Sequence, residues 1–217
     1  MVDLDFTVES TEIEPYAAAP TLLFKVRVTN RTPNVSVQNV SLLCQVRIEA
    51  TRRCYTAADH ERLVELFGET HRWSETLRSL LWTHTSVQVP AFETDRVASL
   101  PVECSYDFNV AATKYFYGLE GGEVPLALLF SGTVFYRDAE GGSLQMDHIA
   151  WSKEANYRLP VQLWKDMMDQ YYPNSAWLRL DRDVFDEIYH YKRQQGFTTW
   201  EQTMHSLLKK QRESALS

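Results

Sequence analysis

The sequence is poor in the features that mark secreted and membrane-spanning proteins. Its 217 residues include only three cysteines, at scattered positions, which fits free thiols in a reducing compartment. The longest apolar runs, such as PLALLF, are far shorter than a membrane span. The first ten residues lack the basic and apolar regions of a signal peptide. We therefore expect a cytoplasmic protein without membrane insertion.

Positive charge is also scarce. The chain has 22 Lys and Arg against 29 Asp and Glu, a formal net charge of −7. An acidic chain does not accumulate on nucleic acid unless it carries a local basic patch. The densest arginine region, residues 51–82, holds as many acidic residues as arginines. Nucleic acid is therefore not an expected partner.

The chain lacks complete motifs for catalysis or metal binding. His60 and Glu61 begin an HExxH pattern, but Val64 stands where the second histidine belongs. Cys54 has no CxxC partner, and no serine occupies a GxSxG elbow. We therefore predict no catalytic residue, no cofactor and no metal. An enzyme whose site is assembled from distant residues stays open as an alternative.

Alternating apolar and polar residues are abundant in the first two thirds of the chain. Phe24, Val26 and Val28 share one face of a predicted strand, with polar residues between them. Similar alternation runs through residues 40–48 and 100–110, and residues 125–151 read as two strands joined by a turn. Alternation of this kind is typical of antiparallel sheets with one buried face.

Two regions follow a helical period instead. Thr56 and Asp59 form a capping-box-like start, and Gly68 ends the first helical run. A second stripe starts at Trp73 and continues through Leu77, Leu80 and Leu81. From Pro160 the chain is helical, and Thr198 with Glu201 is predicted to cap a last helix with Trp200, Met204, Leu207 and Leu208 inside.

These patterns predict an α+β protein. Its core, residues 1–151, is an antiparallel two-sheet β-sandwich-like structure with a helical pair inserted near residues 58–82. A C-terminal helical region, residues 160–217, is predicted to pack on this core. Cys44 and Cys104 fall on inward faces of strands, as in an immunoglobulin inter-sheet disulfide, but without a secretion signal buried free thiols are the preferred interpretation.

A protein partner is the expected ligand, and four residues are candidates for binding it: Arg52, Arg53, Arg72 and Trp73. They lie where the inserted helical pair joins the sheet, and Arg and Trp are over-represented in binding hot spots. The alternative is structural. Trp73 would then belong to the stripe of Leu77, Leu80 and Leu81, and the arginines would pair with glutamates such as Glu69 and Glu75.

Several segments together resemble a bacterial, largely actinobacterial, family of unknown function. They include RRCYTAADHERLVELFGETHRWSETLRSLLW, VECSYDFNVAATKYFYGL and WSKEANYRLPVQLWKDMMDQYYP, and the resemblance covers nearly the whole chain. Members of that family are encoded near uptake-type NiFe hydrogenases, which implies a non-catalytic accessory role in hydrogenase assembly or maturation. The resemblance supplies no catalytic residues. A SecB-like chaperone is a further alternative.

Overall fold

The computed structural model describes residues 2–105, 110–138, 142–176 and 178–215. The chain divides into two compact units, Met1–Ser175 and Ala176–Ser217.

The described part of the first unit contains eight strands in two antiparallel sheets. The strands are β1 (Leu4–Ile13), β2 (Thr21–Asn30), β3 (Val35–Ile48), β4 (Leu80–Phe92), β5 (Asp95–Glu103), β6 (Glu123–Asp138), β7 (Gln145–His148) and β8 (Glu154–Pro160). One sheet has the order β1-β2-β5, and the other has the order β4-β3-β6-β7 with β8 also paired to β6. The predicted α+β class with two antiparallel sheets is confirmed.

The alternating residues predicted to face inward in residues 24–28 and 40–48 do so. Phe24, Val26 and Val28 of β2 are fully buried, and the core joins them to the inward side chains of both sheets. Phe6 of β1 stacks on Phe130 of β6 with ring centroids 4.4 Å apart, so the two sheets meet through direct aromatic contact. Burial of apolar side chains between two sheets is the main stabilising term of such a fold.

The edges of the two sheets lie against each other. β4 lies beside β5, and β1 lies beside β8. Lys153 Nζ contacts carboxylate oxygens of Asp3 and Asp5 at 2.7 and 3.0 Å, which ties the segment before β8 to the start of β1. The backbone N–H of Val2 donates to Asp147 Oδ2 of β7 at 3.1 Å. These contacts close the sandwich along that side.

β6 pairs with β3 along most of its length, but its other edge is shared by two strands. β8 pairs with residues 123–129 of β6, and β7 pairs with residues 133–136. Gly132 lies between the two paired segments, with a φ of +131°. A Cβ atom at this position would lie 2.0 Å from the carbonyl oxygen of Ser41 on β3, so only glycine fits here.

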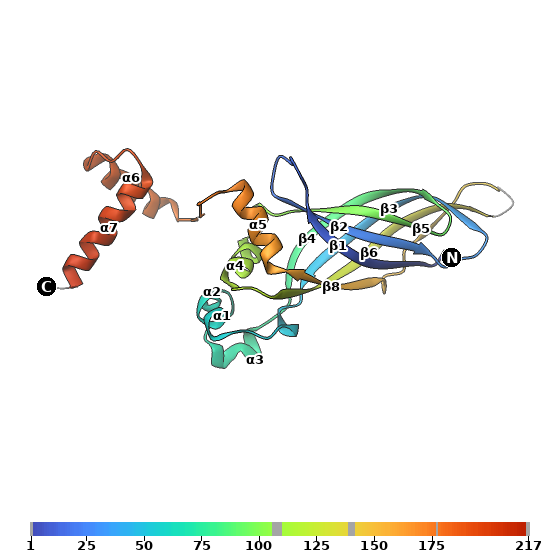
Figure 1. Ribbon diagram of the computed structural model, residues 1–217, viewed down its shortest axis with the longest axis horizontal. Helices are drawn as coiled ribbons and strands as arrows, with labels where there is room; N and C mark the ends of the chain where they lie inside the picture. The colour runs from blue at the N-terminus through green and yellow to red at the C-terminus, as the bar shows by residue number, and fades with distance from the viewer. Residues whose placement is uncertain (1, 106–109, 139–141, 177, 216–217) are drawn as a thin grey trace. The chain divides into compact units, whose positions relative to one another are not determined.

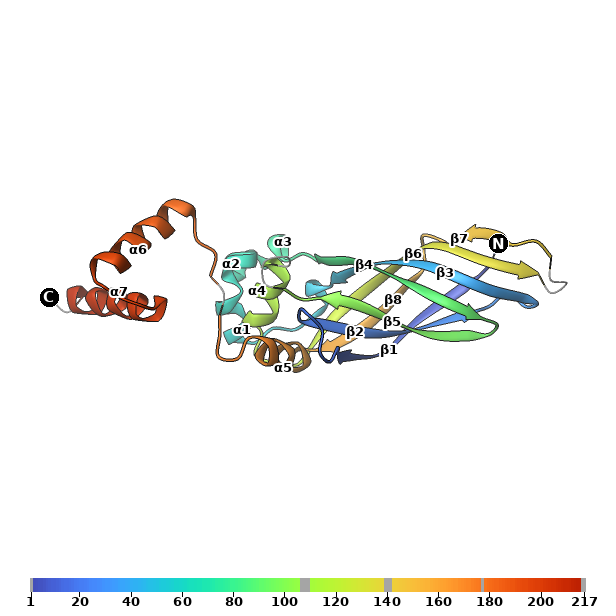
Figure 2. The ribbon, with the colours of Figure 1, turned by 90° about the horizontal axis from the view of Figure 1, so that it is seen from above.

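The helices of this unit gather at one end of the sheets (Figures 1 and 2). They are the 3₁₀ turns η1 (Ala50–Arg52) and η2 (Thr70–Arg72) and the helices α1 (Ala57–Arg62), α2 (Val64–Phe67), α3 (Trp73–Thr76), α4 (Val110–Gly118) and α5 (Val161–Tyr171). The predicted capping box of Thr56 and Asp59 is present, and Gly68 ends α2 with a φ of +73°. These predictions of local structure are confirmed.

Two predictions of local structure in the first unit were wrong. The second inserted helix was expected to continue through Leu80 and Leu81, but α3 ends at Thr76 and both leucines belong to β4. They pair there with Ile48 and Arg47 of β3, so pairing with a neighbouring strand overrides the helical spacing. Val110 was read as a strand residue but begins α4. Residues 106–109 of that predicted strand lie outside the described residues.

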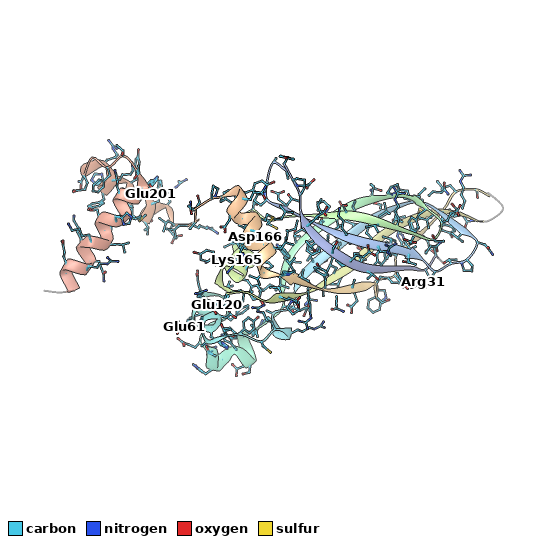
Figure 3. All side chains as sticks on the ribbon, viewed as in Figure 1. Arg31, Glu61, Glu120, Lys165, Asp166 and Glu201 are labelled. Atoms are coloured by element: carbon cyan, nitrogen blue, oxygen red, sulfur yellow. The ribbon has the colours of Figure 1, made fainter. Side chains whose placement is uncertain are left out.

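Helices α4 and α5 pack on each other through Phe116 and Trp164, whose rings stack at 5.2 Å. Lys165 of α5 donates from Nζ to the carbonyl oxygens of Leu119 at 2.6 Å and Glu120 at 3.2 Å (Figure 3). A cation just beyond the end of α4 is also favourable for the helix dipole. This contact fixes the loop that leads into β6.

The second unit is a pair of helices, α6 (Arg182–Gln194) and α7 (Trp200–Ala215). Gly196, with a φ of +68°, follows α6. The last helix is capped one residue later than predicted. Thr199 Oγ1 accepts from the backbone N–H of Gln202 at 3.2 Å, and the Gln202 side chain accepts in return from the N–H of Thr199 at 3.4 Å. The box therefore pairs Thr199 with Gln202 instead of Thr198 with Glu201.

Candidate functional site

The four candidate partner-binding residues do not form one exposed patch. Arg52 and Arg72 are exposed, whereas the side chains of Arg53 and Trp73 are buried. Arg52 Nη1 donates to Asn156 Oδ1 of β8 at 3.0 Å, and its side chain remains 61% exposed. Of the four, Arg52 and Arg72 keep the exposure that direct contact with a partner requires.

Arg53 holds internal groups together. Its guanidinium donates to the carbonyl oxygens of Gly121 and Glu123 in the segment entering β6. Nη2 also lies 3.8 Å from Asp59 Oδ2 of α1. The other oxygen of Asp59 accepts from the backbone N–H of Glu120 at 2.9 Å. Arg53 and Asp59 therefore fasten α1 to the loop before β6, and Arg53 pairs with this carboxylate rather than with Glu69 or Glu75.

Trp73 is 7% exposed and belongs to an aromatic group, not to the predicted leucine stripe. Its ring lies 4.2 Å from that of His60 and 5.1 Å from that of Tyr55. Its Nε1–H donates to the carbonyl oxygen of Gly68 at 2.9 Å, which satisfies the indole where it is buried. Trp73 thus holds the inserted helices together.

Two tyrosines complete this internal group. The hydroxyls of Tyr55 and Tyr115 lie 2.8 Å apart, and the Tyr55 hydroxyl donates to the carbonyl oxygen of Ala50 at 2.7 Å. Burial raises the pKa of Tyr115, and its hydrogen bond with Tyr55 raises that pKa further. Burial raises the pKa of Tyr55 as well. Both hydroxyls are therefore neutral near pH 7, which suits a structural hydrogen bond better than proton transfer.

The three cysteines are all free thiols. Cys44 and Cys104 are buried free thiols, as the sequence predicted, and Cys54 is exposed. Burial raises the pKa of the Cys44 thiol to about 12. Within the described ranges, no three His, Cys, Asp or Glu side chains gather as metal ligands would. No helix of the described chain has the length and apolar character that crossing a membrane requires.

The C-terminal unit presents the most unusual surface. Among residues 176 and 178–214 the only fully buried residue is Thr203, so no hydrophobic side chain described in this unit is buried. Phe185, Tyr189 and Trp200 are 43%, 45% and 36% exposed. We call these three residues the hairpin cluster.

The rings of the hairpin cluster form a continuous group. Phe185 stacks on Tyr189 of α6 with centroids 6.1 Å apart, and Trp200 of α7 lies 5.2 Å from Phe185 and 6.1 Å from Tyr189. Lys192 Nζ lies 5.7 Å from the centroid of Trp200. The two helices are joined elsewhere by the hydroxyls of Tyr191 and Ser206, 2.8 Å apart. The cluster is thus held in one arrangement while much of its ring surface faces outward.

Sequence reasoning missed this surface because it predicted Trp200, Met204, Leu207 and Leu208 to lie inside. In the structure Val184, Phe185 and Leu208 are exposed. Helical periodicity identifies an apolar face but does not say what covers it. The density of aromatics in residues 185–200 was the available signal, since aromatics are enriched at interfaces.

Comparison with known proteins places the chain in a family and gives no activity. No curated protein and no solved structure matches it. A family model with the description "Family of unknown function (DUF6084)" matches residues 1–216. Because the match spans nearly the whole chain, both units are part of what its members share, and this protein belongs to the DUF6084 family of unknown function.

Proposed function

We propose that this protein is a non-catalytic protein-binding module and that the α6–α7 hairpin is the element that binds its partner. The observation that carries the proposal is the exposure of the hairpin cluster in a unit that buries no described hydrophobic side chain. A pair of helices that buries so little apolar surface gains little stability from its own packing. A partner that covers the cluster would supply the missing burial.

The energy available at the cluster is sufficient for specific binding. The three rings are about two-fifths exposed. Covering that fraction would remove about 250 Å² of surface from water, given that each aromatic side chain buries 150–250 Å². At about 25 cal/mol per Å² this contributes about 6 kcal/mol before the costs of association. Aromatic side chains that are already packed together lose little conformational freedom on binding.

Charge distribution on the hairpin suggests the kind of surface that would cover it. The start of α6 is acidic, with Asp183, Asp186 and Glu187, and the end of α7 is basic, with Lys209 and Lys210. These residues are exposed. A matching partner presents an apolar strip bordered by charges of both signs. Such borders set orientation and association rate more than affinity.

The most specific form of the proposal is an accessory role in the assembly or maturation of a NiFe hydrogenase in the cytoplasm. The resemblance noted in the sequence supports this form, and the hairpin supports only the more general one. The non-catalytic part is supported by the buried Arg53, Asp59, Tyr55 and Tyr115, which are engaged with each other or with backbone groups.

Affinity capture from the native bacterium tests the proposal. Full-length protein is compared with a Phe185→Ala/Trp200→Ala variant and with Tyr191→Phe. The second variant loses the hydrogen bond to Ser206 but keeps the hairpin cluster, so it controls for a weakened hairpin. We expect wild type and Tyr191→Phe to retain one stoichiometric partner and the double variant to lose it.

Three other outcomes would be informative. Retention of the same partner by the double variant would reject the hairpin as the binding element. Capture of many unfolded proteins in place of one partner would favour a chaperone. A single partner that is neither a hydrogenase subunit nor a maturation factor would reject the specific form of the proposal and leave the general one standing.

A further inference from the structure

A different surface, on the first unit, carries an inference that is independent of the proposed function. The outward face of the five-stranded sheet contains three adjacent rows across β4, β3 and β6. The rows are Gln88–Ser41–Thr133, Ser86–Leu43–Ser131 and His84–Gln45–Leu129. We call these nine residues the neutral face, because none is Asp, Glu, Lys or Arg, although 24% of the chain is charged.

A hollow and a projecting side chain adjoin each other on this face. The hollow has a volume of about 320 Å³, and its lining includes Leu43, Gln45, His84 and Leu129. Trp151, which is 91% exposed, forms part of its rim. Leu43 is 50% exposed within the same hollow. The face therefore has both a large apolar projection and a recess with an apolar lining.

Trp151 stands on an anchored turn. The N–H of Lys153 donates to the carbonyl oxygen of Ala150 at 3.0 Å and closes the turn. The turn is tied to β6 on both sides, by Ile149 N–H to the Gly132 carbonyl at 3.0 Å and by Phe130 N–H to the Lys153 carbonyl at 2.8 Å. The backbone that carries the indole is therefore already ordered before the face is covered.

We infer that the neutral face is the interface of a two-fold homodimer, in which Trp151 of each copy enters the hollow of the other. A two-fold interface pairs each surface feature with its complement on the same patch, so a projection and a recess must coexist on one face. The neutral face has both. Tryptophan is also among the residues that contribute most to binding at protein interfaces.

Charge favours a second copy over a charged partner. Two copies with a formal net charge of −7 repel each other, and they approach at least cost through a surface whose carboxylate, Glu154 beside Leu129, lies at its border. An acidic or basic partner would find no complementary charge among the nine residues. Depletion of charge is found at the centre of interfaces, and here Leu43, Leu129 and the adjoining Trp151 supply the apolar side chains.

The size of the face is adequate for a modest dimer. The nine residues together with the rows that flank them occupy four neighbouring strands at about 4.8 Å, or about 19 Å, and nine residues of β3 at about 3.4 Å, or about 31 Å. This wider area also includes Arg47 and Glu154 at its border. The product is about 600 Å² per copy, or about 1,200 Å² in total, which is the lower end of specific stable interfaces. The two sheets would stack face to face, as sheets do within sandwiches. Association should therefore depend on concentration in the micromolar range.

Analytical ultracentrifugation of the full-length protein at about 1 to 200 µM tests the inference. This range brackets the micromolar dissociation constants that small interfaces have. We expect wild type to pass from monomer to dimer over this range. Trp151→Ala and Leu43→Lys should weaken the association at least tenfold, the second by placing a charge in the hollow. Val97→Lys and Tyr16→Ala are matched controls, because both residues are exposed and lie outside the face, and they should dimerise as wild type does.

A photo-crosslinking residue at position 151 identifies what occupies the face. A covalent product of twice the chain mass that links position 151 to the lining of the hollow supports the dimer. Cross-linking within one chain to α6–α7 would assign the face to the hairpin and overturn the inference. A monomer at every concentration would overturn it as well, and so would a dimer unaffected by both Trp151→Ala and Leu43→Lys.

Discussion

The guanidinium of Arg53 lies 3.8 Å from the carboxylate of Asp59, and the two side chains are only 9% and 1% exposed. Arg53 also donates to the carbonyl oxygens of Gly121 and Glu123. Its removal leaves a buried carboxylate without its cation and two carbonyls without a donor. We expect Arg53→Ala to lower the free energy of unfolding by about 3 kcal/mol, measured by urea denaturation.

Arg52→Ala is the matched control. The side chain of Arg52 is 61% exposed, and it lies 4.0 Å from Glu49, so its loss should cost about 0–1 kcal/mol. Equal losses in the two variants would contradict the internal role assigned to Arg53.

The three thiols should differ sharply in reactivity. Cys54 is exposed, whereas Cys44 and Cys104 are buried. The thiolate is the reactive form, and burial raises the pKa of both inner thiols. With a chromogenic disulfide reagent at pH 8, one thiol per chain should react rapidly and all three should react after denaturation. Cys54→Ser should abolish the rapid phase; a rapid phase that persists would mean that a buried cysteine opens to solvent.

The Tyr55–Tyr115 hydrogen bond should make the free energy of unfolding depend on pH in alkaline solution. Burial and Tyr55 hold the pKa of Tyr115 above its ordinary value. Up to about pH 10 both the folded and the unfolded protein keep this proton; above it the unfolded chain ionises first. The contribution of Tyr115 is therefore complete below pH 10 and declines by about 1.4 kcal/mol per pH unit above it.

Tyr115→Phe isolates this effect. At pH 8 the variant should be less stable than wild type by about 1 kcal/mol, because it lacks one hydrogen bond. Its disadvantage should shrink above pH 10 and then reverse, since phenylalanine has no proton to lose. Denaturation curves at pH 8 to 11 measure this, and a difference independent of pH would show that Tyr115 ionises equally in both states.

Gly132 should tolerate no side chain. A Cβ atom there would lie 2.0 Å from the backbone oxygen of Ser41, and its φ of +131° is unfavourable for any other residue. We expect Gly132→Ala to lower the melting temperature by at least 10 °C, equivalent to several kcal/mol for a protein of this size. In Gly121→Ala the added methyl group has open space around it, so the melting temperature should change by about 2 °C or less. Similar effects at both positions would contradict the close contact between β6 and β3.

Hydrogen exchange should separate the two units. The amides of α6 and α7 should exchange much faster than those of β2 and β3, because few contacts in the hairpin resist local opening. Addition of the captured partner should slow exchange around Phe185 and Trp200. Strong protection of these helices in the free protein would mean that the chain itself already covers the hairpin cluster.

The strands were the most predictable part of this protein. Phe24, Val26 and Val28 alternate with polar residues, and a sheet with one buried face is the only regular structure that this period suits. The capping box at Thr56 was equally readable, because its hydrogen bonds involve residues three apart. Leu80 and Leu81 were misread because the pairing of β4 with β3 is a contact between segments some thirty residues apart, which local spacing does not reveal.

The candidate site was less predictable than the fold. Arg53 and Arg52 are neighbours of identical type, yet one is buried and the other is exposed. Their difference arises from Asp59 and the carbonyls before β6, which the chain brings together only on folding. The neutral face depends on the registers of three strands, and Trp151 stands on a turn that the sequence does not single out.

β1 faces β8 and β4 faces β5, so each of these edges meets the opposite sheet. A free edge is where an extended peptide adds to a sheet, and it is also where misfolded copies begin to stack. At these four strands, a strand of the opposite sheet already lies where an added peptide would approach. A partner that approaches these four strands must therefore recognise side chains, and a peptide that mimics a β-strand should add poorly to them.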